Sequence, residues 1–317
     1  MSNDESLLTG STRRLLREFK TLNIECEVAN GELNLVRYET AHGTWRFIKG
    51  MVSEKLPHFS YMTCENKWWT YNLFIEMKVP TPKTALYTSD ENAVEFMESE
   101  DTIVVKPQSG AHGYGVTLNV STEDELHKAI THASSVQKDL ILQQQVDGRD
   151  IRILVIGNEI ISALERLPAA VTGDATHTVR ELINLENARP ERGVAGVDAL
   201  IKISVPATEQ YLSTEQLNSI PDLGKRVRVT GPSNHSLGGT VHDVMQELTS
   251  EMKKQITDVT KRLNMPIAGV DCIIDGDRYY FLEINASPGI GIHDDDFAGV
   301  TSGCFNAYAK LLFADNF

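Results

Sequence analysis

Short runs of hydrophobic residues, alternating or continuous, predict a series of strands along this chain. The expected strands cover residues 32–36, 44–50, 84–88, 102–107, 140–144, 151–157 and 159–167. Two more strands are expected within residues 268–289, on either side of an Asp-Gly turn. Gly157-Asn158 is a dipeptide typical of tight hairpin turns, so the two strands that flank it should form a hairpin.

Helices are predicted between these strands by hydrophobic spacing and by capping signals. Residues 64–82 should form one helix that ends at two prolines, and another should begin near Ser89. Thr122 with Glu125, and Thr178 with Glu181, have the spacing of capping boxes. An amphipathic helix is expected over 244–263, where apolar residues step by three and four: Met245, Leu248, Met252, Ile256, Val259 and Leu263. Strands and helices follow no strict βαβ order, which favours an α+β fold over a doubly wound sheet.

Length and composition indicate a globular chain of more than one domain. The 317 residues exceed what one hydrophobic core usually organises, and 41% of them are hydrophobic and 23% charged. The net charge of −14 argues against nucleic acid and anionic membranes as main partners. No apolar run reaches the length of about 18 residues that a membrane span needs.

The cysteines and the first residues bear on the compartment. Cys26, Cys64, Cys272 and Cys304 form no CxxC pair, which argues against a zinc knuckle or a thioredoxin-type motif. Scattered thiols are typical of a reducing compartment, and the N-terminal sequence lacks the order of a signal peptide. We therefore expect a cytoplasmic protein.

A glycine-rich loop after a buried strand is the first candidate for chemistry. Lys106 precedes Gly110, Gly113 and Gly115, and the chain then returns directly to a strand. This order fits neither the Walker loop nor the Rossmann turn. A hairpin tip of this kind can fold over a polyphosphate and donate backbone N–H groups, with the lysine supplying positive charge. The alternative is a surface hairpin whose lysine extends into solvent.

Oxygen ligands on the last two strands form the second candidate. Asp271 lies on one strand, and Glu283 and Asn285 lie on the next, two residues apart and so on one face. Three oxygen ligands that converge in this way suit Mg²⁺. The alternative is an edge strand with its polar face in water. A phosphate loop and a magnesium site in one chain support each other and indicate an enzyme that uses a nucleoside triphosphate.

The segment "LQQQVDGRDIR" is the third candidate. A strand followed by Val146 and Gly148 can present backbone groups to an adenine, while Asp150 reaches ribose hydroxyls. Taken alone, the segment also fits a simple interdomain linker.

Several stretches resemble the ATP-grasp module of cyanophycin synthetases and the C-terminal ligase module of bifunctional glutathione synthetases. The resemblance runs from about residue 35 to residue 295 and rests on "VVKPQSGAHGYGVTLNV", "VDGRDIRILVIGNEIISALERLPAAVTGDATHTVRELINLENARPERG", "NHSLGGTVHDV" and "AGVDCII…YYFLEINASPGIGIH". It implies an ATP-grasp fold, in which two α+β subdomains clamp ATP between antiparallel sheets. The implied division is a short N-terminal region (1–60), a small subdomain with the lid loop (61–145) and a C-terminal subdomain with the magnesium site (146–317).

The resemblance also implies an activity. ATP-grasp ligases join a carboxylate to an amine through an acyl-phosphate, using ATP and Mg²⁺ and releasing ADP and phosphate. The expected partners are a small-molecule carboxylate and amine, such as amino acids or small peptides, and a homodimer is possible. Two alternatives stay open: a catalytically reduced ATP-binding regulatory subunit, and a ligase that modifies the terminus of a protein or peptide.

Residue roles follow from the resemblance, position by position. Lys67 and Lys106 match phosphate-binding lysines, Gly110 and Gly113 belong to the lid over ATP, and Asp150 matches the ribose-binding acid. The implied adenine hinge is Gln144, Gln145 and Val146, and the implied magnesium ligands are Asp271, Glu283 and Asn285. Arg166 matches an arginine near the transferred phosphate or the acceptor, and Ser287 lies where related ligases bind the carboxylate of the amine substrate.

The chain departs from the resemblance in one segment. The synthetases carry arginines where this chain has Thr230 and Gly231. Arg228 is two residues before Thr230, so we expect both side chains on the same face of a strand. Arg228 is therefore the candidate to replace the missing arginines as a catalytic residue. His293 and the acidic residues after it are interpreted as a solvated loop near the mouth of the site, and the role of His112 stays open.

Overall fold

The computed structural model describes residues 4–110, 113–193, 200–231, 235–295 and 299–315. Its centre is a five-stranded antiparallel sheet in the order β13-β10-β9-β14-β15. The strands are β9 (Arg149–Ile156), β10 (Glu159–Leu167), β13 (Thr240–Asp243), β14 (Ile267–Asp275) and β15 (Arg278–Asn285). Both predicted hairpins, β9–β10 and β14–β15, are confirmed.

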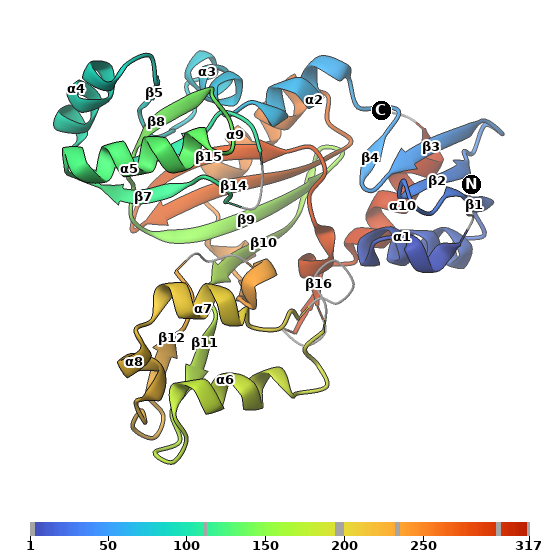
Figure 1. Ribbon diagram of the computed structural model, residues 1–317. Coiled ribbons are helices and arrows are strands. Elements are labelled where there is room, and N and C mark those ends of the chain that lie inside the picture. The colour runs from blue at the N-terminus through green and yellow to red at the C-terminus, as the bar shows by residue number, and fades with distance from the viewer. Residues whose placement is uncertain (1–3, 111–112, 194–199, 232–234, 296–298, 316–317) are drawn as a thin grey trace.

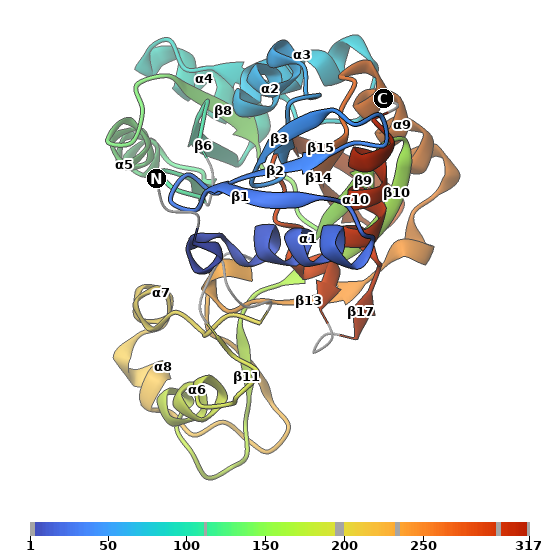
Figure 2. The same cartoon turned by 90° about the vertical axis from the view of Figure 1, so that its right-hand side faces the viewer.

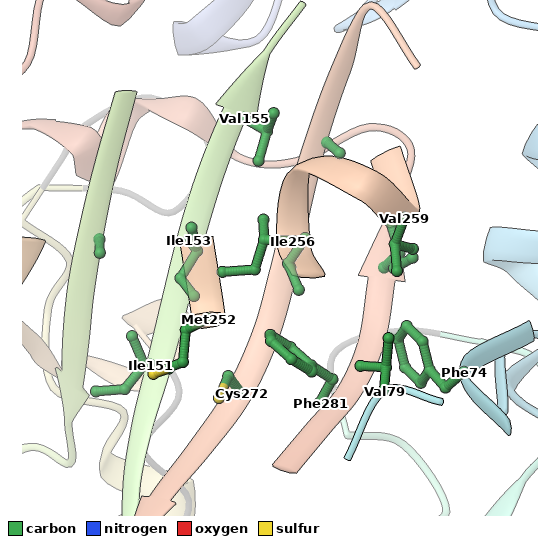
Figure 3. Close-up of a cluster of buried hydrophobic side chains, with 14 of the residues drawn as sticks. Phe74, Val79, Ile151, Ile153, Val155, Met252, Ile256, Val259, Cys272 and Phe281 are labelled. Carbon is green, nitrogen blue, oxygen red and sulfur yellow. The ribbon is translucent and has the colours of Figure 1, made fainter. Parts of the chain in front are cut away.

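The middle strand of the central sheet, β9, is covered on both faces, and it carries apolar residues at the successive positions 153–156. Ile151, Ile153 and Val155 of β9 pack with α9 (Ser250–Arg262) and with Phe281 on one face, as Figure 3 shows. Leu154 and Ile156, which point the other way, belong to a second core shared with the N-terminal region. The central sheet therefore holds the other parts of the molecule in place.

A smaller antiparallel sheet lies above the central one in Figure 1, in the order β5-β8-β6-β7. Its strands are β5 (Thr84–Leu86), β6 (Ile103–Pro107), β7 (Thr117–Val120) and β8 (Leu140–Gln144). It shares a core with α4 (Asp90–Glu100) and α5 (Glu123–Ser134). The predicted helix start near Ser89 and the capping box of Thr122 and Glu125 are confirmed, and Ser89 is the N-cap of α4.

The N-terminal residues form a four-stranded sheet, which packs with the C-terminal helix. The strands β1 (Cys26–Asn30), β2 (Leu35–Glu39), β3 (Trp45–Lys49) and β4 (Val52–Ser53) pair in sequence order. They share a core with α1 (Gly10–Thr21) and α10 (Cys304–Ala314), which lie side by side in Figure 2. The strand predicted at 32–36 is wrong in its start, because a turn with Asn34 in the left-handed region precedes β2.

A lobe inserted after β10 has its own small core. It contains β11 (Ala170–Thr172), β12 (Arg226–Arg228), α6 (Val179–Asn187), α7 (Val205–Tyr211) and α8 (Thr214–Asn218). The capping box of Thr178 and Glu181 at the start of α6 is confirmed. Figure 1 shows the lobe projecting below the central sheet.

Two predicted helices differ from the structure. The single helix expected over 64–82 is two, α2 (His58–Glu65) and α3 (Lys67–Glu76), because Asn66 leaves the helical conformation and caps α3. The helix expected from 244 begins only at Ser250, since Thr249 is its N-cap.

The remaining short elements are η1 (Glu5–Leu7), η2 (His235–Leu237), η3 (Met245–Glu247), η4 (Ile290–His293), β16 (Asp294–Asp295) and β17 (Val300–Thr301). The α+β class is confirmed, and the subdomain boundaries at 60 and 145 stay a prediction. Within the part of the chain that is described, no helix has the length and apolar character to cross a bilayer.

Candidate active site between the two sheets

A cavity of about 500 Å³ opens between the small sheet and the central sheet. It brings together most of the predicted site residues: Lys67, Lys106, Gly110, Gly113, Gln144, Gln145, Val146, Asp150, Arg166, Arg228, Asp271 and Glu283 all line it. Asn285 and Ser287 are not among its lining residues. The cavity therefore joins residues that are far apart in the sequence, such as Lys67 and Glu283, which are 216 positions apart.

Lys106 lies in β6, with its side chain buried at the base of the cavity. Its ammonium group donates to Gln143 Oε1 at 2.8 Å. Burial lowers the pKa of Lys106 to about 8, although the charge of Glu283 partly opposes this. A buried ammonium held by a neutral amide is well suited to bind an anion that enters the cavity.

Lys67 connects the glycine loop to the last strand. It is the first residue of α3, and its Nζ donates to the carbonyl oxygen of Gly110 at 2.7 Å. The same ammonium lies 3.8 Å from Glu283 Oε2. Gly110 and Gly113 have φ values of 111° and 76°, which only glycine adopts without strain. Lys67 thus stands where the loop meets the carboxylate of Glu283. His112 lies outside the described residues.

The hinge Gln144–Val146 passes along one wall of the cavity. The backbone N–H groups of Gln144 and Gln145 donate to Lys83 and Thr102 carbonyls at 2.8 and 3.0 Å, which fixes the path of the hinge. The nearby lining includes the apolar side chains of Val104, Ile273 and Leu282. A slot with apolar walls and an ordered backbone edge suits a planar base.

Two arginines and two aspartates form a largely buried cluster, and three of the four, Asp150, Arg166 and Asp271, line the cavity. Arg166 donates to Asp150 Oδ1 from Nη2 at 2.6 Å and lies 3.4 Å from Asp271 Oδ2. Arg152 Nη2 donates to Asp271 Oδ2 at 3.1 Å. Burial opposes the ionisation of Asp271, yet Arg152 and Arg166 outweigh it and hold its pKa below the ordinary value. Burial raises the pKa of Asp150, with Arg166 partly offsetting this.

The predicted metal ligands lie together on β14 and β15. Asp271 and Glu283 are directly opposed in the strand pairing, and Asn285 Nδ2 is 3.4 Å from Glu283 Oε1. Among the described residues no group of three His, Cys, Asp or Glu side chains could hold a metal. The set here is two carboxylates and an amide, which are hard oxygen ligands of the kind that suits Mg²⁺ with phosphate oxygens completing its shell.

Arg228 reaches the cavity from the inserted lobe. Its side chain is exposed, stacks over the ring of Tyr211 at 5.6 Å and donates from Nε to the carbonyl oxygen of Thr230 at 2.8 Å. The predicted shared strand face of Arg228 and Thr230 is wrong, because β12 ends at Arg228 and the side chain of Thr230 is fully buried. Arg228 therefore supplies a cation to the lining of the cavity, whereas the side chain of Thr230 points into the protein and accepts from Ala169 N.

Ser287 lies outside the cavity, in the exposed turn after β15. A Cβ atom at Gly50, in the N-terminal sheet, would lie 3.6 Å from Ser287 Oγ. The turn that follows β15 therefore lies close to the N-terminal sheet.

The interpretation of His293 as part of a solvated loop is wrong. Its side chain is fully buried, its Nδ1 lies 2.9 Å from Ser162 Oγ, and burial lowers its pKa to about 3. The charges of Arg152 and Arg166 add to this lowering, so His293 stays neutral behind the arginine cluster.

Sequence reasoning missed Arg152 and Gln143. Arg152 follows Asp150 by two residues on one strand, so period-two alternation could have placed both on the same face. Gln143 directly follows the apolar run "LIL" and continues the same strand, so a buried amide that needs partners could have been expected there.

Comparison with known proteins agrees with this geometry. Residues 64–289 match the sequence model of a family described as an ATP-grasp domain. The glutathione biosynthesis bifunctional protein GshAB of Listeria monocytogenes serotype 4b is 30% identical over 315 residues, which cover 96% of this chain and 41% of that protein. Cyanophycin synthetase of a Nostoc species is 31% identical over 251 residues, covering 74% of this chain and 27% of the synthetase.

A solved structure shows the same arrangement of elements. The crystal structure of a bifunctional glutathione synthetase from Pasteurella multocida superimposes with a TM-score of 0.72 at 27% identity, covering 97% of this chain and 44% of that one. The chain thus spans about two fifths of the length of the glutathione relatives that it matches.

Proposed function

Because the chain belongs to the ATP-grasp family, we propose that it is an ATP- and Mg²⁺-dependent ligase that joins a carboxylate to an amine. The substrates proposed are small molecules, an amino acid or small peptide on each side. ATP would be converted to ADP and phosphate through an acyl-phosphate.

One observation carries this proposal: two lysines, from α3 and β6, and two carboxylates, from β14 and β15, share one cavity. Lys106 is buried at its base, and Lys67 lies 3.8 Å from Glu283, which pairs with Asp271. Ammonium groups bind a triphosphate, and the carboxylates bind the cation that accompanies it. A surface hairpin with a solvated lysine would not bury Lys106, so this alternative for the glycine loop does not fit.

The proposed chemistry matches what the residues supply. A carboxylate is a poor electrophile, because attack by an amine would add negative charge to an anion. Transfer of the γ-phosphoryl group to the carboxylate creates a leaving group, and the protein mainly positions the anions and stabilises spread charge. Lys67 and Lys106 would bind the phosphates, while Arg166 and Arg228 would stabilise the phosphoryl group and the acceptor.

Magnesium would be held by Asp271, Glu283 and Asn285. When bound, the ion neutralises phosphate charge during phosphoryl transfer. The two arginines on Asp271 keep this carboxyl ionised and oriented for that role. Gln144, Gln145 and Val146 would contact adenine, Asp150 the ribose, and Ser287 the carboxylate of the amine substrate.

Further parts of the proposal concern setting and partners. A cytoplasmic location agrees with the unpaired cysteines among the described residues. The acidic overall charge argues against nucleic acid and membrane partners. A homodimer is also part of the proposal. Both a regulatory ATP-binding subunit and a ligase acting on a peptide terminus are distinguished by the experiment below.

The test incubates the purified protein with ATP, Mg²⁺ and pools of amino acids and dipeptides. Phosphate release is followed, and products are identified by mass. The proposal expects ADP, phosphate and an amide in equal amounts. Tight ATP binding without turnover on any carboxylate would favour the regulatory subunit, and turnover only with a protein or long peptide would favour terminal modification.

A further inference from the structure

A chain of hydrogen bonds leads from Lys106 back into the small sheet. Lys106 Nζ donates to Gln143 Oε1 at 2.8 Å, and Gln143 Nε2 donates to Thr84 Oγ1 at 2.9 Å. The hydroxyl of Thr84 in turn donates to the carbonyl oxygen of Pro82 at 3.0 Å. Lys106, Gln143 and Thr84 are all at least 92% buried, so each hydrogen bond lies in a low-dielectric interior.

The direction of this chain is fixed by chemistry. An ammonium group only donates, so the amide oxygen of Gln143 must face Lys106 and its NH₂ must face Thr84. The hydroxyl of Thr84 accepts from that NH₂ and gives its own proton to a backbone carbonyl, which can only accept. We call this chain of hydrogen bonds, from Lys106 through Gln143 and Thr84 to Pro82, the relay. The amide of Gln143 and the hydroxyl of Thr84 each have one orientation that satisfies it, and the amide oxygen anchors the ammonium group of Lys106.

Residues 80–84, where the chain of hydrogen bonds ends, also contact β15, the strand that carries Glu283. Phe281 N, in β15, donates to the carbonyl oxygen of Pro80 at 2.8 Å, and Gln144 N donates to that of Lys83. Residues 80–84 thus contact β15, the hinge and the relay. The position of Lys106 is fixed relative to the strand that carries Glu283.

We propose that Gln143 is a positioning residue, which with Thr84 fixes the ammonium group of Lys106 for the phosphates of the bound nucleotide. This rests on the proposed function in one respect, the binding of phosphates by Lys106. A neutral amide at position 143 orients the lysine without competing for its charge. A carboxylate there would form an ion pair with Lys106 and would repel the incoming phosphates.

The test measures the binding of ADP and of adenosine by calorimetry in metal-free buffer. Gln143→Met removes the acceptor and should weaken ADP binding about 10-fold, as expected for loss of a hydrogen bond to a charged group. Gln143→Glu, similar in size and shape, should weaken ADP binding at least as much. Adenosine has no phosphates, so both variants should bind it with an affinity within about 2-fold of the wild-type value. Gln246→Met, at an exposed position, is the control and should bind both ligands as wild type does.

Thr84 provides a second and independent pair of variants. Thr84→Val keeps the shape but breaks the relay, and should weaken ADP binding about 3-fold, because Gln143 loses one of its two anchors. Thr84→Ser keeps the hydroxyl and should restore the wild-type affinity.

A double-mutant cycle separates positioning from general damage. In a Lys106→Met background the further change Gln143→Met should have no effect on ADP binding, because its partner is gone. Equal losses in both backgrounds, equal losses for ADP and adenosine, or wild-type ADP affinity in Gln143→Met would each overturn the proposal. Wild-type protein that binds ADP as described but forms no amide would refute the proposed ligase and leave this inference standing.

Discussion

Arg152 stands directly opposite Asp271 on the neighbouring strands β9 and β14, and its Nη2 lies 3.1 Å from Asp271 Oδ2. Both side chains are largely buried, and Arg166 approaches the same carboxylate at 3.4 Å. The strand pairing therefore determines the charge state of a proposed metal ligand.

Arg152→Met should destabilise the fold by about 2 kcal/mol, because it leaves a buried carboxylate with only one of its two guanidinium partners. Thermal or urea unfolding measures the loss. The double variant Arg152→Met, Asp271→Asn removes both charges and should recover part of the stability. A double variant that is no more stable than Arg152→Met alone would contradict this.

The affinity for ADP should depend on pH through Lys106. Its pKa is lowered to about 8 by burial, so the group is charged below this pH and loses its proton above it. Phosphates bind the charged form, so the affinity should be level below pH 8 and fall above it, by at most about 10-fold per pH unit. Lys106→Met should bind weakly with no such fall. A wild-type affinity that stays level to pH 10 would refute this assignment.

Gly148 should not tolerate a side chain. Its φ is 146°, and a Cβ atom would lie 2.4 Å from the carbonyl oxygen of Ile274. Gly148→Ala should cost about 3 kcal/mol through the clash and the backbone strain together. Gly276, at φ 59° with nothing within 4 Å of a Cβ, is the matched control and should cost about 1 kcal/mol. Equal melting temperatures for the two variants would count against this account of Gly148.

Arg228→Ala should lower the turnover number on the order of 100-fold, as expected for loss of a group that stabilises transition-state charge. ADP affinity should change little. Arg226, exposed on the same strand and not among the cavity-lining residues, is the control, and Arg226→Ala should behave as wild type. If both variants keep full activity, Arg228 does not replace the arginines that the synthetases carry at the positions of Thr230 and Gly231.

Glu283→Gln should reduce turnover more than about 100-fold, because it removes a charged ligand of the proposed magnesium site. ATP binding should lose its dependence on added Mg²⁺, whereas binding without metal should be retained. Glu251→Gln, at an exposed position of α9, provides the control. A Glu283→Gln protein with full activity would exclude the assigned site.

Much of the fold followed from local sequence signals. The run "TIVVKP" and the capping boxes predicted β6, α5 and α6, because β-branched residues and N-cap side chains act on their immediate neighbours. The break at Asn66 was missed, because the sequence does not show whether an asparagine lies inside one helix or caps the start of the next. The pairing of α10 with α1 joins the two ends of the chain, and periodicity carries no information about such contacts.

The candidate site was predicted as a set of residues but not as a network. The resemblance assigned roles to Lys106 and Asp271, and the structure places both in one cavity. Gln143 and Arg152 escaped notice because their importance lies in which side chains they contact across strands. His293 was misinterpreted because a neighbouring acidic run suggested exposure, whereas the histidine itself turns inward to Ser162.

The central claim is that a carboxylate is activated by the γ-phosphoryl group of ATP. Its most direct test uses a carboxylate substrate found in the product screen, labelled with ¹⁸O in both carboxyl oxygens, and determines by mass spectrometry where the label goes. The account predicts that one ¹⁸O appears in the released phosphate and the other stays in the amide. Unlabelled phosphate beside a labelled amide, or release of AMP and pyrophosphate, would contradict it.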